Sequence, residues 1–117
     1  MGFEGLKRWT LTGRSDEVPF LRLSSRDDLN ITFVVMKPAG FIANYQPELH
    51  TVDVTVLELA GPHEACVLNI VTLNPSGHAT VNLKGPLVIN RRTCLGKQVV
   101  LVNAASYGVQ YQLPAPN

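Results

Sequence analysis

The chain has 117 residues, a length typical of a single domain, so we expect one domain over residues 1–117. Hydrophobic residues make up 45% of it and charged residues only 16%, which excludes an intrinsically disordered chain and indicates an apolar surface that a partner could cover. The net charge of +1 lacks the basic excess with which proteins bind nucleic-acid phosphates, so we expect no direct nucleic-acid binding.

The first half of the chain consists of short apolar runs separated by turn residues, the pattern of β-strands. We expect extended segments over residues 9–11, 20–23 and 31–36. The third run is rich in β-branched and aromatic side chains, which favour a strand, and Pro38 and Gly40 end it.

The segment that follows permits two interpretations. Three valines alternate with polar residues over residues 51–60, a period of two that favours a strand. Thr51, however, is a suitable N-terminal cap, and the Gly-Pro pair at residues 61–62 is a strong stop signal for a helix. Local propensity alone favours the strand.

The second half contains the longest strand candidate, residues 65–73, which is almost continuously apolar and so looks buried on both faces of a sheet. Shorter strand candidates follow over residues 79–83, 86–90 and 97–102. Between the first two of these, Gly85-Pro86 predicts a kink or bulge and not a full reversal. Closely spaced strands with turn signals predict an all-β barrel or sandwich.

No constellation of catalytic or metal-binding residues stands out. His50, His63 and His78 lie in or beside expected turns without ligand spacing, so we interpret them as solvated loop residues. Cys94 has no acid–base partner nearby in the sequence, and Gly96-Lys97 lacks the rest of a phosphate-binding loop. We therefore expect no enzymatic activity and no metal or cofactor.

The number of cysteines and the lengths of the apolar runs indicate in which cellular compartment the protein is located. Cys66 and Cys94 are too few for the disulfide framework of a small secreted domain, so we expect two reduced thiols, Cys66 buried and Cys94 near a turn. The N-terminus lacks the apolar region of a signal peptide, and no apolar run approaches the ~20 residues that cross a bilayer. These features predict a cytoplasmic location.

One long motif carries a family resemblance. Residues 79–90 read ATVNLKGPLVIN and residues 95–101 read LGKQVVL, and together they closely resemble the motif of the flagellar assembly factor FliW family. Weaker matches lie in the same order at residues 2–8, 33–38, 44–49 and 69–73. The resemblance spans nearly the whole chain.

The resemblance implies a compact antiparallel β-barrel-like domain with one short helix, which we place at residues 51–59. Members of the family are expected to bind flagellin in the cytoplasm and to bind the RNA-binding translational repressor CsrA. Flagellin occupies the protein while it accumulates, and export of flagellin frees the protein to sequester CsrA. This exchange requires only different affinities for the two partners, and no chemistry.

Two departures from the family pattern bear on this expectation. Family members generally begin earlier, before the Gly2-Phe3-Glu4 segment, so a shorter N-terminus would leave a sheet edge open. This permits an alternative function, a non-catalytic β domain that self-associates through that edge. In addition, an acidic D-Y-E triplet is replaced by Asn44-Tyr45-Gln46, which weakens electrostatic attraction to CsrA.

The surface that we expect to meet a partner comprises Tyr45, Gln46, Asn82, Lys84, Asn90, Lys97 and Gln98. A tyrosine half-buried in a loop can anchor a partner or serve the core, and both roles stay open for Tyr45. An asparagine beside a strand end often satisfies local backbone groups, which is the structural alternative for Asn82 and Asn90.

Overall fold

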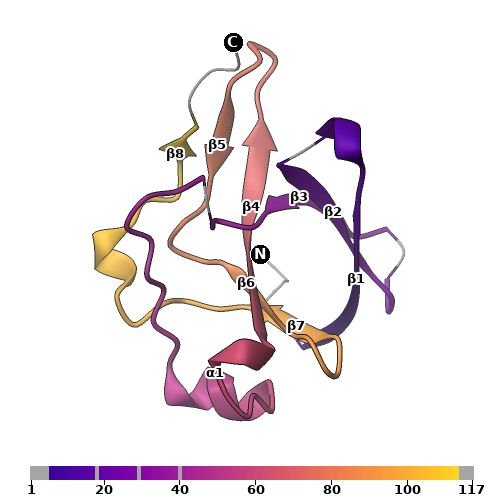
Figure 1. Ribbon diagram of the computed structural model, residues 1–117, viewed down its shortest axis with the longest axis vertical. Coiled ribbons are helices and arrows are strands. Elements are labelled where there is room, and N and C mark those ends of the chain that lie inside the picture. The colour runs from indigo at the N-terminus through magenta and orange to yellow at the C-terminus, as the bar shows by residue number, and fades with distance from the viewer. Residues whose placement is uncertain (1–5, 18, 29, 40, 114–117) are drawn as a thin grey trace.

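The fold is a twisted antiparallel sheet (Figure 1), seen in a computed structural model that describes residues 6–17, 19–28, 30–39 and 41–113. The segment Gly2-Phe3-Glu4, part of the family resemblance, lies outside the described residues. The helical elements are α1 (Thr51–Val56) and the 3-10 turns η1 (Ser15–Glu17), η2 (Pro62–Glu64) and η3 (Ala104–Ser106). The strands are β1 (Lys7–Gly13), β2 (Phe20–Ser25), β3 (Thr32–Met36), β4 (Ala65–Leu73), β5 (Ala79–Val81), β6 (Leu87–Asn90), β7 (Leu95–Gln98) and β8 (Tyr111–Gln112).

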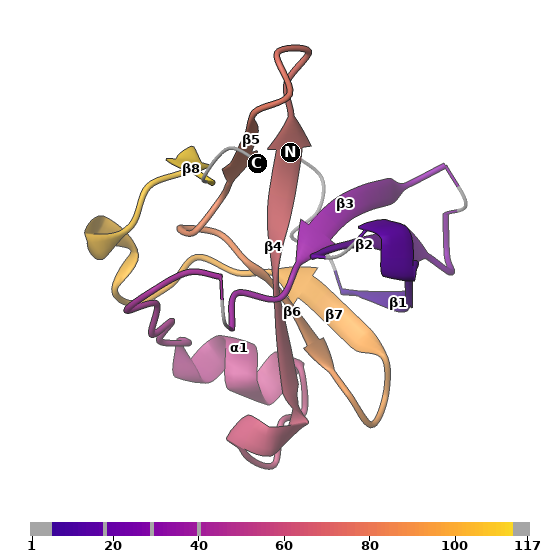
Figure 2. The same ribbon diagram turned by 45° about the horizontal axis from the view of Figure 1, so that its top comes forward.

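Antiparallel pairing closes part of this sheet into a ring. The strand order is β3-β2-β1-β7-β6-β4-β5-β8, and a further pairing of β3 with β4 completes the ring. In Figure 1, β1, β2 and β3 lie to the right of β4, while β5 and β8 extend the sheet to its left. Figure 2 shows the same arrangement after a turn of the molecule. The prediction of an antiparallel, barrel-like β fold with a short helix is confirmed.

Strand β4 lies at the centre of the fold and is buried on both faces, as its sequence predicted. Leu68 faces a core cluster inside the ring, together with Trp9 of β1. On the opposite face, Val71 belongs to a second cluster, and Val67 packs against a third one beside α1. Both faces of this strand are therefore covered, because the chain segments outside the ring pack over it.

The link between β5 and β6 is a bulge, as Gly85-Pro86 predicted. Both strands run antiparallel to β4, so the chain does not reverse between them. The paired positions on the two sides of the bulge, Val71↔Val81 and Leu68↔Leu87, show how many extra residues it contains. From one pair to the other, β4 advances by three residues and its partner by six, so the bulge inserts three residues into the ladder.

The segment that permitted two interpretations is a helix, as the family resemblance implied. Asp53 and Leu57, four residues apart, are both buried, whereas Val52 and Val56 are 66% and 41% exposed. The interpretation as a strand, based on alternating valines, is wrong because the buried face follows the helical period. The helix ends at Val56, before the expected residue 59.

The last expected strand, residues 97–102, is wrong in its position. Strand β7 spans residues 95–98, and its pairing with β6 runs over residues 96–98, where Gly96 lies opposite Ile89. Val99 and Leu101 are buried in the cluster beside α1, and the Val102 N–H donates to the Glu48 carbonyl at 2.8 Å. The apolar run thus continues past the strand because tertiary packing, and not sheet pairing, buries it. Several other strands differ from expectation by a few residues at their ends.

Candidate partner-binding site

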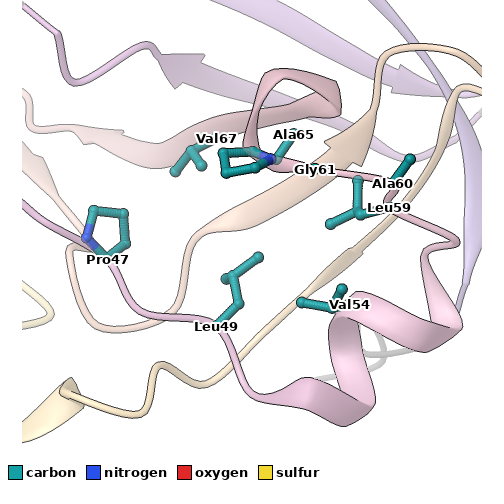
Figure 3. Close-up of a pocket in the computed structure, with 9 residues that line it drawn as sticks. Pro47, Leu49, Val54, Leu59, Ala60, Gly61, Ala65 and Val67 are labelled. Atoms are coloured by element: carbon teal, nitrogen blue, oxygen red, sulfur yellow. The ribbon is translucent and has the colours of Figure 1, made fainter.

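A hollow lined by apolar residues lies between α1 and β4. We call it the apolar cavity; its volume is about 390 Å3. Figure 3 shows Leu49 and Val54 on one side of it and Ala65 and Val67 on the other. Its lining comprises Pro47, Leu49, Val54, Leu59, Ala60, Gly61, Pro62, Ala65 and Val67. A concave apolar surface of this kind receives apolar side chains of a ligand or partner.

The end of α1 shapes one wall of this cavity. Glu58 has a left-handed backbone, with φ of 54°, and its N–H donates to the Thr55 carbonyl at 3.0 Å. The Leu59 N–H then reaches back to the Val54 carbonyl at 3.0 Å, so the helix ends in a Schellman motif. This turn sets the side chains of Val54 and Leu59 along the same cavity.

A network centred on Asn90 holds the helix end against the sheet. Its Nδ2 donates to the carbonyl oxygens of Leu57, at 2.8 Å, and Glu58, at 3.2 Å. Its Oδ1 accepts from the backbone N–H groups of Arg92 and Thr93. Asn90 is fully buried, so it occupies the local structural role that its place at a strand end suggested.

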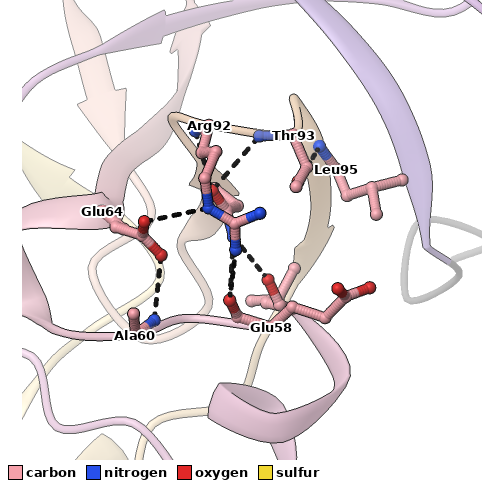
Figure 4. A network of polar contacts seen from close by, with 8 residues as sticks. Glu58, Ala60, Glu64, Arg92, Thr93 and Leu95 are labelled. Atoms are coloured by element: carbon pink, nitrogen blue, oxygen red, sulfur yellow. Dashed lines mark hydrogen bonds and ion pairs between the residues drawn. The ribbon is translucent and has the colours of Figure 1, made fainter.

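Arg92 and Glu64 extend this network (Figure 4). Arg92 Nε lies 3.0 Å from Glu64 Oε2, and its Nη2 donates to the Glu58 carbonyl at 3.0 Å. Glu64 Oε1 accepts from the Ala60 N–H at 2.9 Å. This backbone hydrogen bond, followed by the hydrogen bond from Arg92, lowers the pKa of Glu64. The carboxylate therefore ties the segment after the helix to the turn after β6.

Besides the network centred on Asn90, the candidate site contains a second set of polar contacts, centred on Tyr45. Its hydroxyl donates to the Leu83 carbonyl at 2.7 Å and accepts from Asn69 Nδ2 at 3.1 Å. Its ring meets Tyr107 edge-on, with centroids 4.8 Å apart. Burial raises the pKa of Tyr45. Tyr45 is half-buried and packs against two core clusters, so it joins the loop to the sheet.

The bulge between β5 and β6 brings two more expected residues close to Tyr45. Asn82 Oδ1 accepts from the N–H groups of Lys84 and Gly85, both at 3.0 Å, and so shapes the turn. Gln98 Nε2 donates to the Gly85 carbonyl at 2.9 Å from β7. The Asn82 carbonyl accepts from the same Asn69 amide group that binds Tyr45, which links the bulge to the loop.

Lys97 and Gln46, two of the remaining expected residues, lie apart from this group. Lys97 Nζ forms an ion pair with Asp53 Oδ1 at 2.9 Å, which fastens α1 to β7. The side chains of Gln46 and Lys84 are exposed. Around the bulge, the structure thus places Tyr45, Asn82, Lys84 and Gln98. Asn90 and Lys97 lie at α1. Gln46 lies beside the apolar cavity, whose lining begins with Pro47.

The apolar cavity could not be predicted from the sequence. Its walls come from residues 47–49, 54–62 and 65–67, which read separately as loop, helix end and strand. A signal was present in the Gly-Pro pair at residues 61–62, which begins the 3-10 turn η2 that leads directly into β4. The three histidines, by contrast, are exposed as expected. Among the described residues, no three His, Cys, Asp or Glu side chains form a group that could hold a metal.

Comparison with known proteins identifies the family. The model of the family described as "FliW protein" matches residues 1–113. The chain belongs to the FliW family. The flagellar assembly factor FliW of Thermosipho africanus is 34% identical to it over 115 residues, which cover 96% of this chain and 78% of the relative. The FliW of Natranaerobius thermophilus is 37% identical over 103 residues, which cover 86% of this chain and 68% of the relative.

A solved structure of a FliW protein shares this fold. The crystal structure of a flagellar assembly factor FliW matches with a TM-score of 0.74 and 28% identity, and the match covers 93% of this chain and 75% of the other. The match extends over most of the antiparallel sheet described above. In the part of the chain that the structure describes, no helix is both long and apolar enough to cross a membrane.

Proposed function

We propose that this FliW-family chain is a non-enzymatic, cytoplasmic regulator that binds flagellin and antagonises the translational regulator CsrA. Its membership of a family of flagellar assembly factors supports this role. The observation that carries the proposal is the match of the family model to residues 1–113. Flagellin synthesis would then be coupled to flagellin export through the free concentration of this protein.

The coupling would operate by mass action. While flagellin accumulates, it occupies the protein, and export of flagellin releases the protein to bind CsrA. The exchange is strongest when occupation by one partner lowers the affinity for the other, and this effect is reciprocal. The net charge of +1 gives no long-range attraction to either partner, so contacts at short range must supply the affinity.

We place the flagellin-binding surface at the apolar cavity and the exposed side of α1. Val52 and Val56 project outward from the helix, and the cavity opens beside it. An amphipathic helix can place one apolar face in such a groove. Gln46 and Lys84 are exposed and can add polar contacts, whereas Asn82 and Asn90 support the surface through the backbone.

Calorimetry with purified flagellin and purified CsrA tests the proposal. Leu49→Ala, inside the cavity, is expected to weaken flagellin binding by about 1–3 kcal/mol. Val100→Ala is the matched control, because Val100 is exposed and does not line the cavity. Flagellin is also expected to displace CsrA from the protein. Absence of binding heat for both partners, with every protein folded, would contradict the proposed function.

A Tyr45→Ala variant separates two roles of that side chain. If the ring contacts flagellin directly, affinity falls by about 1–3 kcal/mol while the melting temperature changes little. We expect the melting temperature to fall as well, because the hydroxyl binds Leu83 and Asn69 and the ring packs on Tyr107. Tyr45→Phe removes only the hydroxyl and is the matched variant.

The alternative role, self-association through an open edge, is not favoured by the strands of the ring, and among the described strands β8, a strand of two residues that pairs only with β5, is the one left at the end of the strand order. β1 pairs with β2 on one side and with β7 on the other, and the pairing of β3 with β4 closes the ring. We therefore do not adopt it.

A further inference from the structure

A second cavity contains both cysteines of the chain. Its volume is about 320 Å3, and its walls come from β1, β4, the start of the loop after β2 and the turn between β6 and β7. The groups of interest in its lining are the thiols of Cys66 and Cys94, the guanidinium groups of Arg26 and Arg91, and the indole of Trp9. We call it the thiol cavity. It does not overlap the lining of the apolar cavity.

The Cys94 thiol is the accessible one of the two. Cys94 is partly exposed, whereas Cys66 is only 7% exposed. The backbone fixes the position of Cys94, since its N–H donates to the Asn90 carbonyl at 2.8 Å and its carbonyl accepts from the Trp9 N–H at 3.0 Å. Its φ of 64° is in the left-handed region, which a cysteine adopts only when its surroundings hold it there.

The charges that face this thiol are positive. Arg26 Nη2 lies 3.7 Å from Cys94 Sγ, and Arg26 Nε donates to Thr10 Oγ1 at 2.9 Å. Arg91 lines the same cavity, and no carboxylate of the part of the chain that the structure describes does. Within the described residues, neither guanidinium group forms an ion pair. A small anion entering the cavity would therefore meet two cations that form no ion pair with an acidic side chain of the described residues.

We propose that Cys94 is a thiol-exchange site for small anionic disulfides. The Cys94 thiolate attacks one sulfur of the disulfide RS–SR, a new S–S bond forms to Cys94, and the original S–S bond breaks. The second half leaves as the thiolate RS⁻ with the electron pair, and the proton of the Cys94 thiol passes to water. Arg26 and Arg91 attract the carboxylates of the reagent and hold those of the bound half.

Oxidised glutathione, a tripeptide disulfide that carries carboxylates, is the first probe. Intact mass is expected to show one glutathionyl group per chain, removed by dithiothreitol and mapped to Cys94. Cys94→Ser is expected to abolish the adduct, and Cys66→Ser to retain it. Trp9, the single tryptophan, lines the same cavity, so its fluorescence is expected to change with the adduct. An adduct on Cys66, or none, would overturn the proposal.

The role of charge is tested with two aromatic disulfides, one dianionic and one uncharged. The Arg26→Gln, Arg91→Gln double variant is expected to react roughly 3- to 10-fold more slowly with the dianionic reagent only. Arg14→Gln is the control, because Arg14 lies outside the cavity lining. Salt gives the same test without substitution: it should slow the dianionic reagent and not the uncharged one. Equal effects on both reagents would refute the role of the arginines.

Discussion

Replacing Asn90 by alanine tests whether this side chain supports the fold or contacts a partner. The substitution removes two hydrogen bonds that the Asn90 side chain donates to the carbonyls at the helix end. It also removes two that the side chain accepts from the backbone N–H groups of the turn that follows β6. The Glu58 carbonyl keeps its bond from Arg92, but the Leu57 carbonyl, in buried surroundings, loses the donor at 2.8 Å. A buried polar group without a partner costs about 1–3 kcal/mol, so we expect a total loss of about 2–4 kcal/mol.

The assay is thermal unfolding followed by circular dichroism. For the 117 residues, an unfolding entropy of about 2 cal/mol/K per residue converts that loss into a fall in Tm of about 8–16 °C. Asn82→Ala is the matched control, since its two bonds serve a more exposed turn, and about 1 kcal/mol is expected. An Asn90→Ala variant with an unchanged Tm but weakened flagellin binding would refute the structural role.

Three further predictions concern stability. Glu58 has a left-handed backbone at the end of α1, a conformation that glycine adopts without steric strain. Glu58→Gly is therefore expected to raise the free energy of unfolding by about 1 kcal/mol in urea titrations, whereas Glu58→Ala is not. Gly96→Ala would place a methyl group 2.9 Å from Trp9 and 3.0 Å from the Val88 carbonyl, so unfolding scans should show a loss of about 1–3 kcal/mol. Because the pKa of Glu64 is lowered in the fold, its contribution is complete above the ordinary value of about 4.3 and is lost as pH falls through the folded-state pKa. Glu64→Gln should therefore flatten the acid limb of Tm against pH, and an unchanged limb would contradict this.

The sheet could be predicted from the sequence largely because strand signals are local. The continuous apolar run gave β4 with its observed ends, and the Gly-Pro pair gave the bulge between β5 and β6. The helix α1 could not be predicted from alternation, because Asp53 is buried there by its ion pair with Lys97, a partner distant in the sequence. Only the family resemblance gave that helix.

The candidate site was harder to predict, because it depends on contacts between distant segments. Tyr45 meets Leu83 and Tyr107 only after the loop before α1 packs over the bulge. Asn90 gave a local signal as a strand-end asparagine, and that interpretation of its side chain agrees with the hydrogen bonds. The apolar cavity has walls from three segments whose separate patterns give no sign that they meet.

The closure of the ring has a consequence for the order of events during synthesis. Lys7 pairs with Gly96, so a strand near the beginning of the chain is completed by one near its end. Pairing between strands so far apart in sequence slows folding, because the loop between them must close first. Until residues 95–98 have been synthesised, β1 has no β7 to pair with. We expect the growing chain to form its β1–β2–β3 meander and the pairings of β4 with β3, β5 and β6 first, whereas the ring closes only after Gly96 has left the ribosome.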